Sequence, residues 1–247
     1  MGSFPFDPGA DPVRVALSLD RTWLHRVGIS RFTYERMIRR AGGQPIRLRF
    51  SSGIDASGAA SLLEGIGALL LSGGGDVDPR LYGAPPETGL DVRPARDAFE
   101  QVLLAEADRR RLPVLGIGRG LQILNVVRGG TLRNLRGDPT IWRRHGRFAT
   151  HSVRLVPGSR LADLLGEGLP GAVTSYHAQS IGEPGRGVRV VGWSDDGVIE
   201  AIEAGSPDRW VVGVQWHPEL LCGDAMGRRL FAAFVAAARH GEEAMHR

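Results

Sequence analysis

The residues best suited to chemistry follow an apolar run that ends at Val214, in the segment Gln215-Trp216-His217-Pro218-Glu219. A histidine two residues before a glutamate, at the carboxyl end of a strand, can place its imidazole against a nucleophile while the carboxylate orients the ring and stabilises its charged form. His217 and Glu219 are therefore a candidate general base and its partner. Because His-x-Glu pairs are also common in surface loops, the assignment depends on a nucleophile position elsewhere in the chain.

The segment from Pro113 to Gln122 has the pattern of such a position. A short apolar run leads through a turn at residues 116–120 into a helix. Elbows of this kind hold a nucleophile at the top of a parallel sheet, where the turn lifts the side chain toward substrate and the helix N-terminus stabilises negative charge. The apex here is Gly118, which has no side chain to react.

Two further segments offer polar groups to a substrate. The run Gly73-Gly74-Gly75-Asp76 follows apolar residues, and its backbone N–H groups could hold an oxyanion, although a tight exit from a strand would need the same glycines. The segment Ser175-Tyr176-His177-Ala178-Gln179-Ser180 brings together hydroxyl, imidazole and amide groups that could bind a polar substrate head. A structural histidine with satisfied hydrogen bonds is an equal alternative for His177.

Strands and helices must position these segments, and in the first half of the chain the two patterns alternate. Apolar runs predict strands at residues 13–19, 45–48, 67–71 and 113–117, and helical spacing predicts helices at residues 30–41, 55–63, 92–111 and 119–127. Strands that alternate with helices predict right-handed crossovers and a parallel sheet.

The second half has a different pattern. Short strands are predicted at residues 152–156, 188–193, 198–202 and 210–214, too closely spaced for alternating strand-helix units, and we expect them to extend the central sheet in an antiparallel region. Residues 131–150 are polar and rich in arginine, and we expect them to form a surface excursion near the site. The last predicted element is an amphipathic helix at residues 225–238.

Composition bounds the class of protein. The chain has 247 residues, 42% of them hydrophobic, and no apolar run approaches the length of a membrane helix. All 31 basic residues are arginines, and they are dispersed rather than arranged in a stripe, so the net charge of +4 does not indicate nucleic-acid binding. Cys222 is the single cysteine, which excludes an internal disulfide and indicates a reducing compartment.

These observations predict one domain without nucleic-acid or membrane partners. We expect a flexible tail at residues 1–12, a single α/β domain at residues 13–240 and a second tail at residues 241–247. The first residues lack a basic start followed by an apolar core, so no secretory signal is predicted and a cytoplasmic location is expected. The sequence is also compatible with a homodimer.

Several of these segments together resemble the γ-glutamyl hydrolase branch of the class I glutamine amidotransferase superfamily, peptidase family C26, and in particular γ-glutamyl-γ-aminobutyrate hydrolase-like proteins. The resemblance rests on Pro113 to Gln122, Gln215 to Glu219, Leu70 to Pro79, Arg96 to Glu100, Gly130 to Leu132 and Ser175 to Ser180. It implies a three-layer, flavodoxin-like α/β fold with a mostly parallel central sheet, helices on both faces and an antiparallel extension.

The resemblance also implies a reaction and a set of site residues. Family members use a cysteine thiolate that attacks a γ-glutamyl amide, forms a thioester and is released by water. Gly118 occupies the nucleophile position, and His217 and Glu219 occupy those of the base and its carboxylate. Backbone N–H groups of Gly74 or Gly75 and of Arg119 would form the oxyanion hole. The implied substrate-binding residues are Asp76, Gln122, Tyr176, His177 and Gln179; the implied partner is a small γ-glutamyl or amino-acid-like molecule, with no metal or organic cofactor.

The departure at Gly118 leaves three interpretations. The glycine is natural, and His217 and Glu219 act on a bound small molecule by altered chemistry; or the glycine was introduced to inactivate a γ-glutamyl amide hydrolase; or the chain is a non-catalytic binding or partner protein on a dead hydrolase scaffold. Cys222 stands three residues after Glu219, the wrong place for the elbow, and is not expected to replace the nucleophile.

Overall fold

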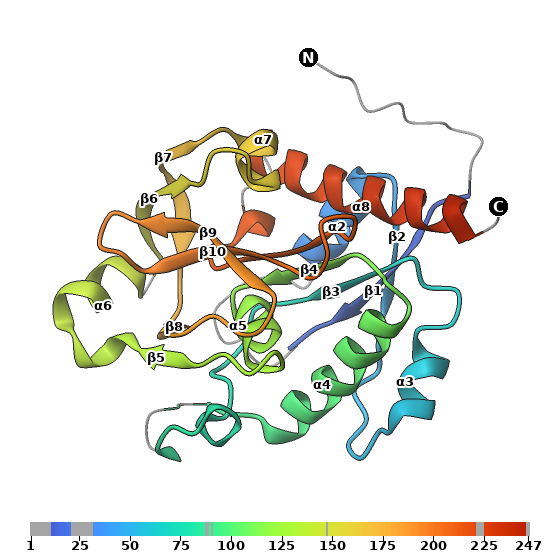
Figure 1. Cartoon of the computed structure of the whole chain (residues 1–247), viewed down its shortest axis with the longest axis horizontal. Helices are drawn as coiled ribbons and strands as arrows, with labels where there is room; N and C mark the ends of the chain where they lie inside the picture. Colours follow the sequence, from blue (N-terminus) through green and yellow to red (C-terminus); the bar gives the residue numbers. More distant parts are fainter. Residues whose placement is uncertain are drawn as a thin grey trace.

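A nine-stranded sheet forms the centre of the molecule in the computed structural model, which describes residues 11–20, 32–86, 89, 91–146, 148–220 and 225–245 (Figure 1). The strands, in their order across the sheet, are β2 (Gln44–Arg47), β1 (Arg14–Ser18), β3 (Ala68–Leu71), β4 (Val114–Ile117), β11 (Val211–Val214), β10 (Ile199–Ala204), β9 (Val188–Ser194), β6 (Ala149–Leu155) and β7 (Gly168–Ser175). A separate two-stranded sheet pairs β5 (Leu132–Asn134) with β8 (Gln179–Ile181).

The sheet divides into a parallel and an antiparallel half. Strands β2, β1, β3, β4 and β11 pair in parallel, whereas β10, β9, β6 and β7 pair antiparallel. The predicted parallel sheet with an antiparallel extension is therefore confirmed. The sequence pattern placed residues 210–214 in the antiparallel region, but β11 lies in parallel beside β4 and antiparallel only to β10. The end of β11 consequently lies next to the end of β4.

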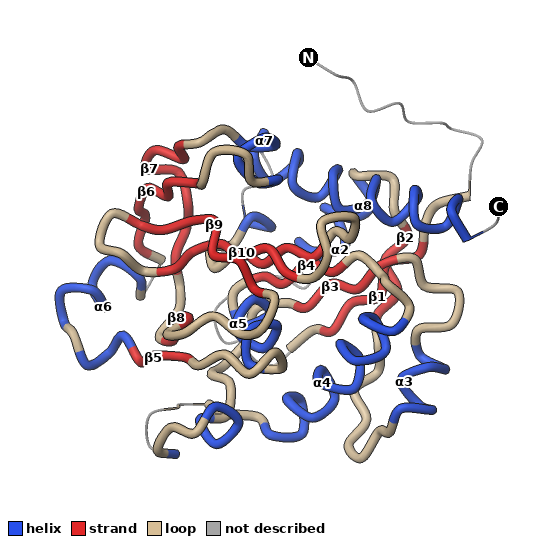
Figure 2. The backbone as a smooth tube through the Cα atoms, viewed as in Figure 1, coloured by secondary structure: helices blue, strands red, loops and turns tan. Residues whose placement is uncertain are grey.

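Helices cover both faces of the sheet, as the tube in Figure 2 shows. One face carries α2 (Phe32–Arg40), α7 (Arg160–Leu165) and α8 (Ala225–Met245), and the other carries α3 (Ala56–Leu62), α4 (Pro94–Arg109) and α5 (Arg119–Val126). Each face has its own hydrophobic core, because alternate strand residues point to opposite sides. In β1, Val15 and Leu17 pack in the first core and Ala16 in the second.

Residues 131–150, expected to form a surface excursion, contain regular structure. They include β5, the start of β6 and α6 (Pro139–His145). Asp138 caps α6 through its side chain, which accepts hydrogen bonds from the N–H groups of Thr140 and Ile141. The polar composition concealed these elements, and the pattern also gave no signal for α7, β7 and β8.

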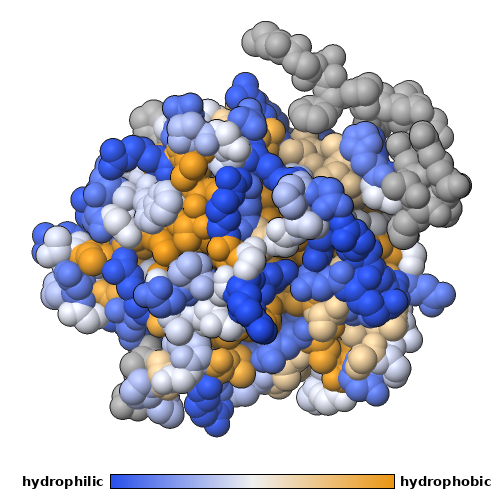
Figure 3. Space-filling model, in the orientation of Figure 1, coloured by the Kyte–Doolittle hydropathy of each residue, from blue (hydrophilic) through white to orange (hydrophobic). Residues whose placement is uncertain are grey.

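The ends of the described chain differ from the sequence expectation at one point. Helix α8 continues to Met245 and so includes most of the segment predicted as a tail from residue 241. Residues 1–10, most of the predicted N-terminal tail, and Cys222 lie outside the described residues. Of the helices in the described residues, none combines the length and apolar character needed to cross a membrane. Figure 3 shows hydrophilic residues spread over the viewed face, with hydrophobic residues gathered over β9.

Candidate active site

The elbow predicted at Gly118 is present and joins β4 directly to α5. Gly118 has φ 57° and ψ −112°, and its N–H donates to the carbonyl of Val214 at 2.8 Å, which ties the apex to the end of β11. The neighbouring glycines are needed for space, because a Cβ on Gly116 would collide with the backbone of Gly120, and one on Gly120 with the carbonyl of Leu71. A Cβ on Gly118 would meet nothing closer than 3.5 Å. The apex therefore has room for a side chain, and only its positive φ favours glycine.

His217 faces this apex. The position of a Cβ on Gly118 lies 3.5 Å from His217 Cε1 and 3.6 Å from His217 Nε2. On its other side, Nδ1 of His217 lies 2.6 Å from Oε1 of Glu219, and both side chains are buried. A proton on Nδ1 that is donated to the carboxylate leaves Nε2 as a proton acceptor directed toward the elbow. The predicted base and its carboxylate are thus brought together beside Gly118, the predicted nucleophile position.

Tyr34, in α2, links this pair to residues 72–77 after β3, which we call the glycine loop. Sequence reasoning did not identify Tyr34. Its hydroxyl accepts a hydrogen bond from the N–H of Gly73 at 3.2 Å. Burial, followed by the charge of Glu219 and a hydrogen bond to that carboxylate, raises the pKa of Tyr34 well above its usual value, so the hydroxyl keeps its proton. Since the N–H of Gly73 is used in this way, Gly74 and Gly75 remain the loop's candidates for an oxyanion.

A buried network of ion pairs holds the backbone of the glycine loop in place. Arg96 donates to the carbonyls of Ser72 and Gly73 at 3.1 and 3.2 Å and to Glu100 at 2.9 Å. The side chain of Arg119 pairs with Asp97 and Glu100. Burial raises the pKa of Glu100, but the two guanidinium groups outweigh it and leave that pKa lowered.

The network also explains the glycine at position 74, where a Cβ would collide with the guanidinium of Arg96. The predicted role of Arg119 concerned its backbone N–H at the start of α5, and the side chain is now seen to belong to this network. Arg96, Asp97 and Glu100 appeared in the sequence only as a segment of the resemblance. Their spacing along α4 could have indicated a shared buried face.

Gln122 and Gln179 hold four segments of the chain together. Gln122 donates to the carbonyl of Gln179 at 2.8 Å and to the side chain of Gln215 at 3.1 Å. The side chain of Gln179 accepts from the N–H of Val77 at 2.9 Å and donates to Tyr82 at 2.9 Å. Both predicted substrate amides therefore make hydrogen bonds within the protein, and they join the glycine loop to the end of β11.

The other predicted substrate residues make contacts within the protein as well. Asp76 pairs with Arg136 at 3.0 Å, so Arg136 joins the set of polar groups that follow the glycine loop. The ring of Tyr176 packs against Phe148, with centroids 4.7 Å apart. His177 is buried, and its Nδ1 lies 2.9 Å from the carbonyl of Gln179.

Replacing Tyr34 by phenylalanine is expected to lower the free energy of unfolding by about 1–3 kcal/mol, because the buried N–H of Gly73 loses its acceptor. Urea denaturation would measure the loss. Tyr82→Phe is the matched control, since Tyr82 is half-buried and its partner Gln179 keeps two other hydrogen bonds to Val77. Equal losses for the two variants would contradict a linking role for Tyr34.

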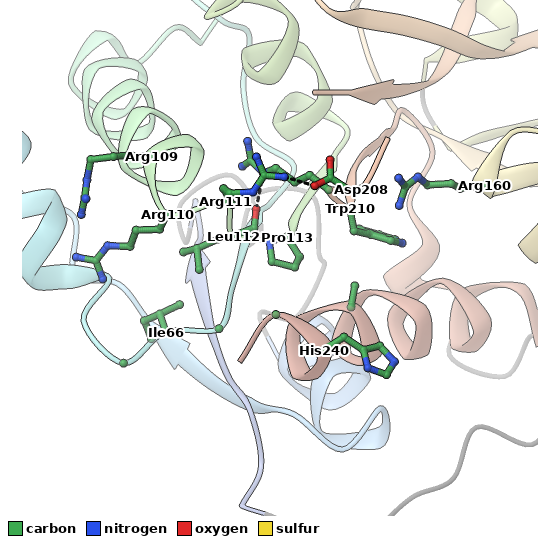
Figure 4. Close-up of a pocket in the computed structure, with 15 residues that line it drawn as sticks. Ile66, Arg109, Arg110, Arg111, Leu112, Pro113, Arg160, Asp208, Trp210 and His240 are labelled. Atoms are coloured by element: carbon green, nitrogen blue, oxygen red, sulfur yellow. Dashed lines mark hydrogen bonds and ion pairs between the residues drawn. The ribbon is translucent and has the colours of Figure 1, made fainter. Parts of the chain in front are cut away.

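A cavity of about 990 Å³ lies at the end of the parallel strands that is opposite to the elbow (Figure 4). Its walls include Pro113 and Trp210, which precede β4 and β11, so it opens at the amino ends of the strands whose carboxyl ends carry the elbow. Arginines surround it, but Arg111 pairs with Asp208, and Arg109 and Arg110 pair with Glu106. Ligands of open α/β sheets bind at the carboxyl ends of the strands, so the reaction is not assigned to this cavity.

The chain is similar in sequence to several named proteins. The γ-glutamyl-γ-aminobutyrate hydrolase PuuD of Escherichia coli K12 is 33% identical over 219 residues, which are 84% of this chain and 85% of that protein. A candidate glutamine amidotransferase of Mycobacterium tuberculosis is 42% identical over 190 residues, which are 75% of this chain but only 60% of the relative's length. Protein NtpR of Enterococcus hirae is 37% identical over 207 residues, 80% of this chain and 84% of that protein.

Solved structures agree with the fold. A glutamine amidotransferase of Thermotoga maritima superposes with a TM-score of 0.57 at 16% identity, over 96% of this chain and 94% of that one. The model of the family described as Peptidase C26 matches residues 17–219, which contain the glycine loop, the elbow and the His217–Glu219 pair. The chain therefore belongs to the Peptidase C26 family, with the α/β fold of the glutamine amidotransferase-like hydrolases.

Proposed function

We propose that this chain binds a small γ-glutamyl or amino-acid-like amide at the elbow and acts on it through His217 and Glu219 without a covalent intermediate. The observation that carries the proposal is the placement of His217 Nε2, 3.6 Å from the position of a side chain at Gly118, with Glu219 on the opposite ring nitrogen. The space that a sulfur atom would fill can then hold a water molecule or a substrate atom.

The polar groups beside the glycine loop suit an amino-acid head group. Such a group carries an ammonium and a carboxylate, and Asp76 and Arg136 present the opposite charges. Their mutual ion pair at 3.0 Å keeps both side chains in place before a substrate arrives. The name of the Escherichia coli relative, a γ-glutamyl-γ-aminobutyrate hydrolase, supports a γ-glutamyl amide as the substrate class.

In the proposed reaction a water molecule replaces the thiolate. Its oxygen attacks the amide carbonyl while His217 Nε2 accepts its proton; the C–N bond then breaks, and the protonated histidine returns the proton to the departing amine. The developing oxyanion would be held by the N–H groups of Gly74 or Gly75 and of Arg119 at the start of α5. Because one covalent step is lost, the rate is expected to be far below that of a cysteine-bearing enzyme.

Binding and slow release of glutamate test this proposal separately. Calorimetry with γ-glutamyl-γ-aminobutyrate should show binding, and Arg136→Gln should weaken it by about tenfold or more, as expected for loss of a charged hydrogen bond. Arg133→Gln is the matched control, since Arg133 lies three residues away and contacts Ser180 instead. His217→Gln should abolish glutamate release and leave binding intact.

Three results would count against the proposal in different ways. If the chain neither binds the amide nor releases glutamate, the substrate class is wrong. If Arg133→Gln weakens binding as much as Arg136→Gln, the placement of the head group is wrong. If the chain binds the amide and His217→Gln changes nothing, the alternative of a non-catalytic binding protein is favoured.

A further inference from the structure

Three histidines and a glutamate meet in a buried cluster that the proposed reaction does not use. His145 ends α6, His151 lies in β6, His177 lies between β7 and β8, and Glu200 lies in β10. One ligand atom from each lies within 4.8 Å of every other, and their exposed fractions are 0%, 4%, 8% and 0%. We call these four residues the histidine cluster.

The inner atoms of the histidine cluster are close but are not hydrogen-bonded. Oε1 of Glu200 lies 3.2 Å from Nδ1 of His145, 3.5 Å from Nε2 of His151 and 3.5 Å from Nε2 of His177. Within the described part of the chain, these four buried atoms find no hydrogen-bond partner. Buried polar atoms without partners are costly, so the arrangement calls for a group that all four can share.

The outer nitrogens of the three histidines determine what that group is. Nε2 of His145 lies 3.1 Å from both carboxylate oxygens of Asp196. Nδ1 of His151 lies 3.1 Å from the carbonyl of Ser152, and Nδ1 of His177 lies 2.9 Å from the carbonyl of Gln179. These oxygens can only accept, so each outer nitrogen carries a proton, and each ring that is otherwise neutral directs a lone pair at Glu200.

A single proton does not satisfy this centre. It can join only one of the three inner nitrogens to the carboxylate, which leaves two lone pairs facing a buried anion. A divalent cation is shared by all four atoms at once. In a tetrahedral site with ligands about 2.0–2.2 Å from the metal, ligand atoms stand about 3.4 Å apart. The three separations from Glu200, 3.2, 3.5 and 3.5 Å, are close to this value, and the histidine nitrogens, within 4.8 Å of one another, would move closer together around the ion.

We propose that the histidine cluster binds a divalent transition-metal ion, with Zn²⁺ as its preferred occupant. Imidazole and carboxylate ligands suit Zn²⁺, and histidine ligands whose other nitrogen donates to a carboxylate or backbone carbonyl are typical of zinc sites. All four positions are taken by protein side chains, which is the pattern of a structural rather than a catalytic site. The site is independent of the function proposed for the elbow.

The ion would connect the antiparallel half of the sheet to the segments that surround the elbow. It links α6, β6 and β10 to the segment that contains His177 and Gln179, and the carbonyl of Gln179 accepts from Gln122 in α5. Gln179 also holds the glycine loop through Val77. Removing the metal should therefore loosen the segment after β7 first.

Metal content and thermal stability of the full chain, purified without a residual affinity tag, test the proposal. We expect one zinc per chain by elemental mass spectrometry, and for chain treated with a chelator a fall in Tm of about 5–10 °C that added ZnCl₂ reverses. Chain reconstituted with CoCl₂ should show the visible absorption of tetrahedral Co²⁺. These readouts do not depend on enzymatic activity.

Variants locate the ion. His151→Ala should lose the stoichiometric metal while retaining the wild-type far-ultraviolet circular dichroism, and Asp196→Asn should weaken zinc affinity by about tenfold or more through its effect on His145. His240→Ala, which removes an exposed histidine of α8, should keep one zinc. The proposal is overturned if the chelated wild-type chain takes up neither Zn²⁺ nor Co²⁺, or if His151→Ala binds either ion as the wild type does.

Discussion

Replacing Gly118 by cysteine is expected to raise the rate of γ-glutamyl amide hydrolysis by about 10³-fold or more, because it restores the covalent route that a glycine apex lacks. The surrounding geometry already suits a thiol. A Cβ at this position would stand 3.6 Å from His217 Nε2, and a sulfur one bond further on can come within hydrogen-bonding reach of the base. The helix N-terminus and the nearby imidazole both favour the thiolate. Steady-state release of glutamate would measure the gain.

The same substitution should cost stability. Gly118 has φ 57°, and a side chain in this region of backbone space costs about 1–3 kcal/mol. Gly118→Ala is the matched control, since it carries the same backbone strain without the thiol. We expect both variants to lose similar free energy of unfolding and only the cysteine variant to gain activity. An equal gain in the alanine variant would show that the effect comes from the backbone and not from a nucleophile.

Breaking the ion network beneath the glycine loop should have the largest effect on stability. Arg119→Met leaves the buried carboxylates of Asp97 and Glu100 without one of their cations, and removal of one partner from a buried network costs about 3–5 kcal/mol. The loss should appear in the free energy of unfolding from guanidinium denaturation. Because Arg96 also contacts Glu100 and the loop, binding of the substrate amide should weaken in any Arg119→Met chain that remains folded.

Arg111→Met provides the comparison for this prediction. Arg111 pairs with Asp208 on the surface, where both side chains are more than half exposed, and solvent screens such a pair. Little or no loss of stability is expected from its removal. The account of the network would be contradicted if Arg119→Met were as stable as Arg111→Met.

The parts of this molecule that could be predicted from sequence are those encoded in short, continuous segments. The strand-turn-helix at Gly118, the glycine loop and the segment of His217 and Glu219 each carry their own pattern. The parallel strands could be predicted equally well, because buried strands such as β3 and β4 are continuous apolar runs between helices. Local signals sufficed for these segments, but not for α6, α7, β7 and β8, which were missed because their composition is polar or their apolar pattern is weak.

The parts that escaped prediction depend on contacts between distant segments. Strand β11 pairs in parallel with β4, although it follows antiparallel strands in the sequence, so its neighbour could not be derived from spacing. The histidine cluster also depends on distant segments. Its residues come from α6, β6, the segment between β7 and β8, and β10, and no interval between them resembles a local metal motif. Tyr34 was similarly hidden, because its role depends on Glu219, far along the chain.

Intact-protein mass spectrometry of the Gly118→Cys chain, mixed with γ-glutamyl-γ-aminobutyrate and quenched within seconds, tests the central claim most directly. The account predicts a transient γ-glutamyl adduct at position 118 that disappears as glutamate accumulates, and none in the unmodified chain or in Gly118→Ala. Persistent absence of both adduct and glutamate in the cysteine variant, with binding of the amide intact, would contradict the assignment of His217 and the elbow as a γ-glutamyl amide hydrolase site.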